Sequence, residues 1–139
     1  MRCRESIDRD RECGQSLLET AFMVLVVFIV VFWIVEICGL MYTYATIANA
    51  AEEGARYGII ASGAVANDSR IVARVKNFAG ASLHDVSLIS VQVTFPDGGS
   101  APPNRILVTV SYTYVPWLNN VTKNPLIMTA YAEGRRVVQ

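Results

Sequence analysis

The strongest constraint on the fold is a long apolar run near the N-terminus. Residues 20–35 contain no charged side chain, and the apolar character resumes after Glu36 as far as Met41. Counted from Ser16, this stretch reaches the roughly 20 residues that a helix needs to cross about 30 Å of hydrocarbon. Because backbone amides find no water inside lipid, a helix is the conformation that satisfies them there. The run therefore predicts a membrane-spanning helix that extends to about residue 41.

We expect the helix to continue beyond the membrane. Residues 42–60 contain no proline and are rich in alanine, so we predict one helix from about Ser16 to about Ile60. Within this part, Ala50, Gly54 and Gly58 recur every four residues. Small residues at this spacing let another backbone approach closely. Two explanations stay open for this ridge: a contact between subunits, or a seat for the C-terminal domain of the same chain.

A carboxylate, Glu19, lies just inside the start of the apolar segment. A charge at the centre of a spanning helix costs roughly 2.5–3.5 kcal/mol and less near its ends, so Glu19 could simply reach the headgroups. A second explanation involves Gly14. If the chain were cut after Gly14, Gln15 would carry a free α-amine, which is cationic at neutral pH because its reference pKa is about 7.7–8.0. That amine and Glu19 could pair between two staggered helices and so set their register.

These residues resemble the class III signal of type IV pilin precursors, and most closely the TadE-like pseudopilins of tight-adherence secretion systems. Those proteins typically have a start like G-Q-A-L-V-E, an apolar run, then E-F-G, and later A-x-x-G-A-R. The matching segments here are Gly14–Glu19, Glu36–Gly39 and Ala50–Tyr57. The resemblance is specific over about residues 14–58.

The resemblance implies a function for the chain. A prepilin peptidase would cut between Gly14 and Gln15, and the mature chain would assemble with other pilin or pseudopilin subunits through its apolar helix. Glu19 and Gln15 would fix the stagger between subunits. The implied role is a minor pseudopilin that starts or caps a tight-adherence pilus. One alternative is the main repeating subunit of a filament. An alternative of another class is an uncleaved, membrane-anchored periplasmic binding domain, which would need neither Gly14 nor Glu19.

The position of the expected cut and the distribution of arginines predict the topology. A secretory signal is cut after its apolar core, whereas here the cut would precede the apolar run and leave the span with the product. Four arginines precede the span, and Arg56 alone follows it closely. Lys and Arg collect on the cytoplasmic side, so we expect a cytoplasmic N-terminus and a periplasmic or extracellular C-terminal domain.

Glu36 lies 17 residues after Glu19, about 26 Å along a helix axis. If Glu19 is near one membrane boundary, Glu36 is near the other. It would then mark the exit into water, or make a polar contact between packed helices. Aromatic residues suited to the interface lie at similar depth: Trp33, Tyr42 and Tyr44.

The C-terminal part of the sequence predicts a small α+β domain. A short helix should follow the cap candidates at 67–69 and end at Gly80, with one apolar stripe made of Ile71, Val72, Val75 and Phe78. Alternating apolar residues at 89–95, 106–114 and 126–132 predict three antiparallel strands packed against the long helix. The predicted regions are a leader at 1–14, the long helix at 15–61 and the domain at 62–139.

The sequence shows no arrangement of histidine, cysteine or acidic residues that predicts catalysis. Twelve basic residues balance twelve acidic ones, so no overall field favours nucleic acid. His84 is the only histidine, the three cysteines are Cys3, Cys13 and Cys38, and the domain carboxylates are scattered over different loops. These residues predict no triad, no paired acid and base, and no metal cluster. We therefore expect no enzyme, cofactor, metal, nucleic acid or small-molecule substrate. The expected partners are the membrane, a prepilin peptidase and other subunits.

Overall fold

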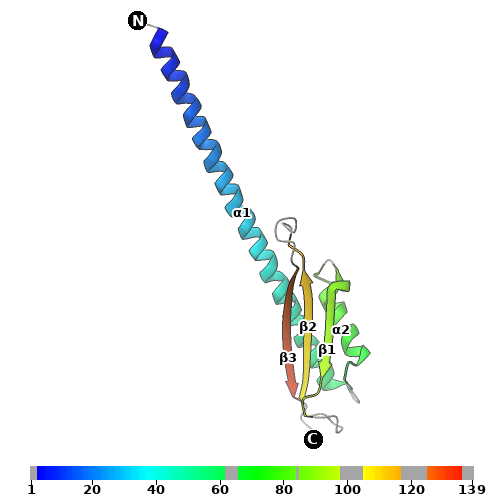
Figure 1. Ribbon diagram of the computed structural model, residues 1–139. Helices are drawn as coiled ribbons and strands as arrows, with labels where there is room; N and C mark the ends of the chain where they lie inside the picture. Colours follow the sequence, from blue (N-terminus) through cyan, green and yellow to red (C-terminus); the bar gives the residue numbers. More distant parts are fainter. Residues whose placement is uncertain (1–2, 62–65, 84, 98–104, 117–124, 136–139) are drawn as a thin grey trace. The chain divides into compact units, whose positions relative to one another are not determined.

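The computed structural model describes residues 3–61, 66–83, 85–97, 105–116 and 125–135. Its elements are labelled in Figure 1 and have these bounds: α1 Cys3–Ile60, α2 Ser69–Gly80, the 3₁₀ helix η1 Val86–Leu88, β1 Ile89–Thr94, β2 Arg105–Tyr114 and β3 Leu126–Arg135. The predicted α+β class is confirmed: a long N-terminal apolar helix, a short helix and a three-stranded antiparallel sheet. The chain forms two compact units, Met1–Cys38 and Gly39–Gln139.

Helix α1 begins earlier than predicted, at Cys3 instead of about Ser16, and ends at Ile60 as expected. Residues 3–13 contain no proline or glycine, and their arginines and glutamates are good helix formers. A single Gly14 costs a helix about 1 kcal/mol relative to alanine, which is too little to end it. The expected cleavage point therefore lies inside continuous helix.

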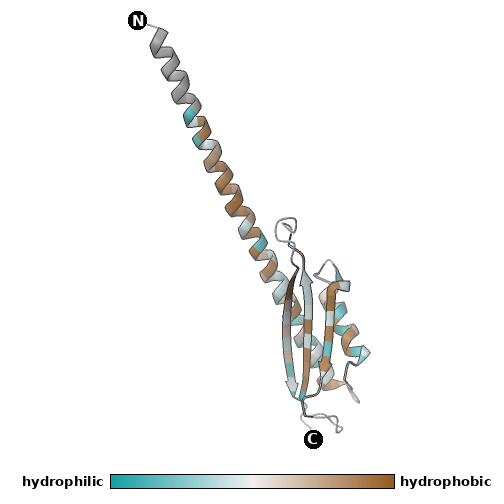
Figure 2. Ribbon diagram, viewed as in Figure 1, coloured by the Kyte–Doolittle hydropathy of each residue, from teal (hydrophilic) through white to brown (hydrophobic). Residues whose placement is uncertain are grey.

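The apolar run of α1 is exposed on every side. Each large apolar side chain from Leu17 to Val35 has an exposed fraction between 48% and 74%. Figure 2 shows most of this run as a hydrophobic band on α1. Thr20, at the start of the run, satisfies its hydroxyl by donating to the carbonyl of Ser16 at 2.9 Å. By length and composition, Gln15–Ile60 could cross a membrane.

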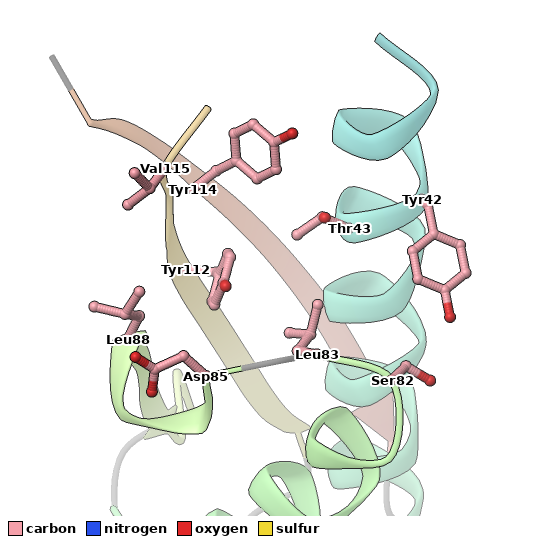
Figure 3. Close-up of a pocket in the computed structure, with 9 residues that line it drawn as sticks. All are labelled: Tyr42, Thr43, Ser82, Leu83, Asp85, Leu88, Tyr112, Tyr114 and Val115. Carbon is pink, nitrogen blue, oxygen red and sulfur yellow. The ribbon is translucent and has the colours of Figure 1, made fainter. Parts of the chain in front are cut away.

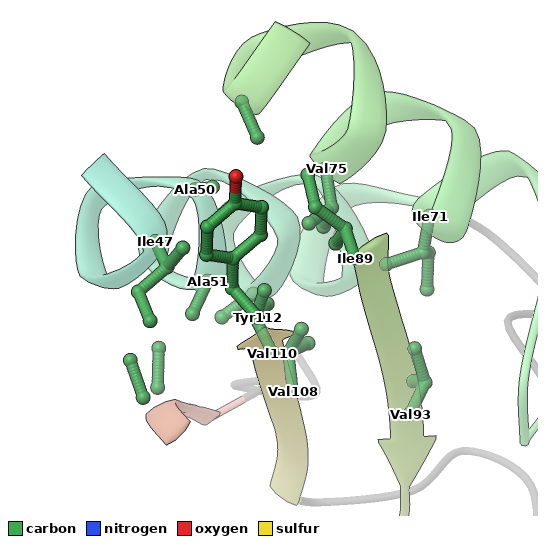
Figure 4. Packing of buried hydrophobic residues seen from close by; sticks show 14 of the residues in the cluster. Ile47, Ala50, Ala51, Ile71, Val75, Ile89, Val93, Val108, Val110 and Tyr112 are labelled. Atoms are coloured by element: carbon green, nitrogen blue, oxygen red, sulfur yellow. The ribbon is translucent and has the colours of Figure 1, made fainter. Parts of the chain in front are cut away.

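The sheet has the order β1-β2-β3, and both pairings are antiparallel. Val110 lies opposite Val91 of β1 and opposite Ala130 of β3, so these three residues share one face. That face is buried, and its side chains meet those of α1 and α2 in the core (Figure 4). The other face carries Ser, Thr and Gln side chains, consistent with the alternation expected for a sheet covered on one side.

Strand β3 is longer than predicted, because it runs to Arg135 instead of Ala132. The added residues keep the register with β2, in which Gly134 lies opposite Ile106. A Cβ on Gly134 would come within 2.7 Å of Ile59 on α1. The missing side chain therefore lets the helix lie close to the end of this strand.

Helix α2 has the predicted bounds, but its buried face differs from the predicted stripe. Its buried residues are Ile71, Val75 and Ala79, whereas Phe78 is 44% exposed. At about 100° per residue, a stripe through 71, 75 and 79 places position 78 at its edge. The prediction was wrong for Phe78, because a small alanine next to it packs into the core instead.

Two residues before α2 have different roles, which the sequence alone did not distinguish: one caps the helix and the other binds the sheet. Asp68 is the N-cap, and its side chain accepts from the backbone N–H of Arg70 at 2.9 Å. Asn67 has a φ of 54° and is bonded to β1. Its N–H donates to the carbonyl of Val93, and its Oδ1 accepts from the Val93 N–H at 3.0 Å. Asn tolerates this left-handed conformation better than most residues.

Candidate assembly surface

The candidate site begins with the exposed start of α1. Gln15 and Glu19 are both exposed and lie four residues apart on α1, so they face the same side of the helix. Among the residues whose side chains are described, from Gln15 onward, Glu19 makes no hydrogen bond or ion pair. Its neighbours on the next turns are apolar and exposed, as Phe22 and Met23 illustrate. The single chain thus presents a carboxylate at the edge of a wide apolar surface.

Glu36 lies at the other end of the run and is half-buried. The aromatic residues expected at this depth are all exposed, with exposed fractions of 60% for Trp33, 59% for Tyr42 and 49% for Tyr44. The thiol of Cys38 is free and exposed in the structure. The two acids therefore bracket an uncharged stretch of α1 between them.

The small-residue ridge lies against the chain's own domain. Ala50 is fully buried, and Cβ atoms added to the glycines would run into side chains of α2 and the sheet. At Gly54 the added atom would meet Val75 and Val108, and at Gly58 it would meet Ile106 and Ile71. In this structure the ridge is the seat of the domain, one of the two explanations left open by the sequence.

An ion pair joins the two helices beside this seat. Arg74 of α2 donates to Glu53 of α1, with 2.8 Å between Nη2 and Oε1. Arg70 similarly pairs with Asp68 at 2.8 Å. Two arginines on the exposed side of α2 thus pair with acids of the same chain. They therefore offer little free charge for an anionic partner.

The described residues contain no group of three or more His, Cys, Asp or Glu side chains that could hold a metal ion. His84, the only histidine, lies outside the described residues. A hollow on the domain was not predicted from sequence. It brings Thr43 of α1 together with Asp85 and Tyr112 (Figure 3). No local pattern could have revealed it, because these residues are at least 27 positions apart.

These features define a class of protein first. It is an α+β protein with one long helix, in which the large apolar side chains from Leu17 to Val35 are exposed and the small residues Ala50, Gly54 and Gly58 lie under the domain. In a comparison with protein families, residues 14–56 match the family model of TadE-like proteins. The resemblance seen in the sequence is therefore confirmed, and this segment is TadE-like. It contains Gly14, Gln15, Glu19 and Glu36, whereas the domain from residue 62 onward lies outside it.

Comparison with curated proteins and with solved structures gave no match.

Proposed function

We propose that this chain is a structural subunit of a tight-adherence-type pilus system, and specifically a minor pseudopilin that initiates or caps the filament. The TadE-like match suggests a subunit related to such pili. The observation that carries the finer proposal is the exposed apolar rod with Glu19 at its entrance. The proposal includes no catalytic activity.

The exposed rod requires an apolar environment. Burial of apolar surface contributes roughly 25 cal/mol per Å², so a helix exposed along its whole circumference would not stay in water as a monomer. Lipid satisfies this requirement before assembly, and neighbouring helices satisfy it afterwards. Because lipid tails are as apolar as the helix, the second step is driven by close packing and polar contacts. Glu19 is suited to supply such a contact.

The partner of Glu19 would be created by proteolysis. In the uncut chain, the nitrogen of Gln15 is a peptide amide inside α1 and carries no charge. Cleavage after Gly14 by a prepilin peptidase would convert it into an ammonium at neutral pH. In a bundle of staggered helices, the amine of one subunit would face Glu19 of the next and set the register. The proposal includes the orientation expected from the arginines before the span, with the N-terminus in the cytoplasm and the domain outside the inner membrane.

The N-terminal residue of the protein recovered from its own cells tests this proposal. Intact mass and N-terminal sequencing should give a chain that begins at Gln15, with or without a methyl group. A Gly14→Leu variant should retain residues 1–14, because a bulky side chain replaces the small residue before the cut. An intact Met1 in the unmodified protein, or a cut after the apolar run, would contradict the proposal.

The role of the carboxylate has a separate test. Glu19→Gln keeps the shape and removes the charge, so the protein should still insert in the membrane. Its cross-linking to other subunits should fall by about tenfold, the effect of about 1.4 kcal/mol. Glu52→Gln is the matched control, because Glu52 is an exposed acid on the same helix outside the apolar run. Equal cross-linking of both variants would show that the charge of Glu19 does not pair the subunits.

A further inference from the structure

The domain carries a hollow that the assembly role does not use. It has a volume of about 340 Å³ and opens between α1, η1 and β2, with every lining residue inside the unit Gly39–Gln139. Tyr112 and Tyr114 project from β2 toward Thr43 of α1, as Figure 3 shows. Leu83 and Leu88 add apolar walls. This volume lies in the range of small-molecule sites.

The two tyrosines and the threonine are held in place. Tyr112 is 8% exposed and belongs to the buried core. The hydroxyl of Tyr114 lies against α1, 3.3 Å from the point where a Cβ on Gly39 would be. Thr43 donates its hydroxyl to the carbonyl of Gly39 at 2.9 Å. The walls of the hollow are therefore formed by ordered side chains before any ligand arrives.

Among the described residues that line the hollow, Asp85 is the one that carries a charge. Its Oδ1 accepts from the Oγ of Ser87 at 2.6 Å and from the N–H of Ser87 at 2.9 Å. The side-chain hydrogen bond from Ser87, followed by the backbone one, holds the pKa of Asp85 below its usual value. Burial raises the pKa of Tyr112, and the negative charge of Asp85 raises it further. The carboxylate is thus ionised at neutral pH, and it lines the same hollow as the neutral Tyr112.

This combination selects the charge and the type of the ligand. The described residues that line the hollow include no Lys or Arg, so an anion placed among them would meet the negative charge of Asp85. A hard metal ion would want six or more oxygen ligands, and one carboxylate does not provide them. A small organic cation matches each wall: the ammonium pairs with Asp85, tyrosine faces attract positive charge, and the leucines contact its alkyl part.

We propose that this hollow binds a small organic ammonium group of the kind that ethanolamine carries. Two sources share this chemistry: the headgroup of phosphatidylethanolamine and a free amine in solution. Thr43 comes two residues after Met41, where the sequence predicts the end of the membrane span. Tyrosines next to a span are typical of the headgroup layer. A lipid headgroup is therefore within reach of the site.

Fluorine NMR of the full chain tests the proposal directly. The protein would be labelled with 3-fluorotyrosine, assigned at Tyr112 and Tyr114, and placed in nanodiscs of phosphatidylglycerol, which carries no ammonium. Added ethanolamine should shift both resonances in a saturable way, with a Kd of about 1 mM. Nanodiscs that contain phosphatidylethanolamine should show the shifted resonances without added amine if the lipid is the source. A response to ethanolamine alone would assign the site to a soluble amine.

Matched variants separate specific binding from a general salt effect. Asp85→Asn keeps an Oδ1 that can accept both bonds from Ser87, so the turn should fold, and ethanolamine should bind at least about tenfold more weakly. Ser82→Lys, on the rim, should weaken binding with Asp85 intact because it adds a competing cation. Glu52→Gln should bind normally. No saturable shift with either source, an unchanged response in Asp85→Asn, or an equal response to sodium chloride would overturn the proposal.

Discussion

The two halves of helix α1 have the same backbone conformation and opposite surroundings. Near the middle of the first half, Ile29 is 49% exposed, and its neighbours are exposed on all sides. In the second half, Ile47 is fully buried and contributes to the domain core. Large apolar residues fill most of positions 20–35, whereas positions 43–58 are rich in alanine, glycine and threonine. The helical conformation therefore does not determine what surrounds the helix. The size of the side chains does.

The difference in size has a physical consequence. Small residues at four-residue spacing let a sheet and a second helix approach α1 closely, which is what Gly54 and Gly58 permit. Large residues around the whole circumference cannot fit against a single small domain, so they require lipid or other helices. The same helix is thus a folding scaffold over one part of its length and, under the proposed function, an insertion or assembly surface over the other.

The largest expected effect comes from one truncation made in each half. Ile47→Ala should lower the free energy of unfolding of the domain by about 3 kcal/mol, because it leaves a cavity in the core. Ile29→Ala removes the same atoms and should leave that free energy unchanged. Hydrogen exchange of the β2 amides in detergent micelles measures both. Comparable loss of protection in the two variants would mean that the first half also supports the domain.

A pair of glycine substitutions should change the free energy of unfolding of the domain by a smaller amount. Gly58→Ala should lower this free energy, whereas Gly39→Ala should leave it unchanged or raise it. In a helix, Gly→Ala alone is favourable by about 1 kcal/mol. At Gly58 the new methyl would collide with Ile106 and Ile71, so overpacking should reverse this gain and cost the domain about 1–2 kcal/mol.

The control for Gly58→Ala is Gly39→Ala. There, among the described residues, the added methyl meets the hydroxyl of Tyr114 at 3.3 Å, and a shift of a few tenths of an ångström relieves this contact. Its domain stability should be unchanged or rise by up to about 1 kcal/mol. Exchange rates of the β2 amides again provide the measurement, and equal effects at the two positions would contradict the tight seat around Gly58.

Local patterns predicted much of this fold. Alternation over 106–114 identified a half-covered strand, and cap residues with Gly80 gave the bounds of α2. The extension of β3 to Arg135 could not be predicted in the same way. It depends on Gly134 facing Ile106 across the sheet and Ile59 on α1, and both contacts link distant parts of the chain.

The candidate sites also divide into one that local sequence could reveal and one that depends on contacts between distant residues. Gly14, Gln15 and Glu19 could be identified from sequence because their relation is local, within two turns of one helix. The hollow around Asp85 could not, because Thr43 and Tyr112 reach it from other elements. Phe78 was assigned to the core by its apolarity, although the small Ala79 occupies the position that faces the core.

A still smaller effect should follow from the cap of α2, which affects only the domain. Asp68→Ala removes the acceptor for the Arg70 N–H and should cost about 1 kcal/mol. Asp68→Asn retains a capping oxygen and should cost less than half of that, since the ion pair with Arg70 is partly exposed. Thermal unfolding followed by near-UV circular dichroism of the tyrosines would show the ranking. An equal loss in both variants would assign the effect to the charge instead of the cap.

The smallest effect is a pH dependence that should be confined to the domain. Arg105 donates to Asp97, with 2.8 Å between Nη2 and Oδ1, and this hydrogen bond is the main cause that holds the pKa of Asp97 below its usual value. Because the pKa is lower in the folded protein, the ionised carboxylate contributes stability above about pH 4, and this contribution is lost as the pH falls through the folded pKa.

Thermal unfolding between pH 6 and pH 3 should therefore show a fall in Tm that is smaller in Asp97→Asn. Part of the fall should remain in that variant, because Ser87 lowers the pKa of Asp85 as well. Residues 20–35 contain no titratable side chain, so the helicity of this stretch of α1 should not change over this range. A fall in Tm that is identical with and without Asp97 would show that its pairing with Arg105 contributes nothing to the domain.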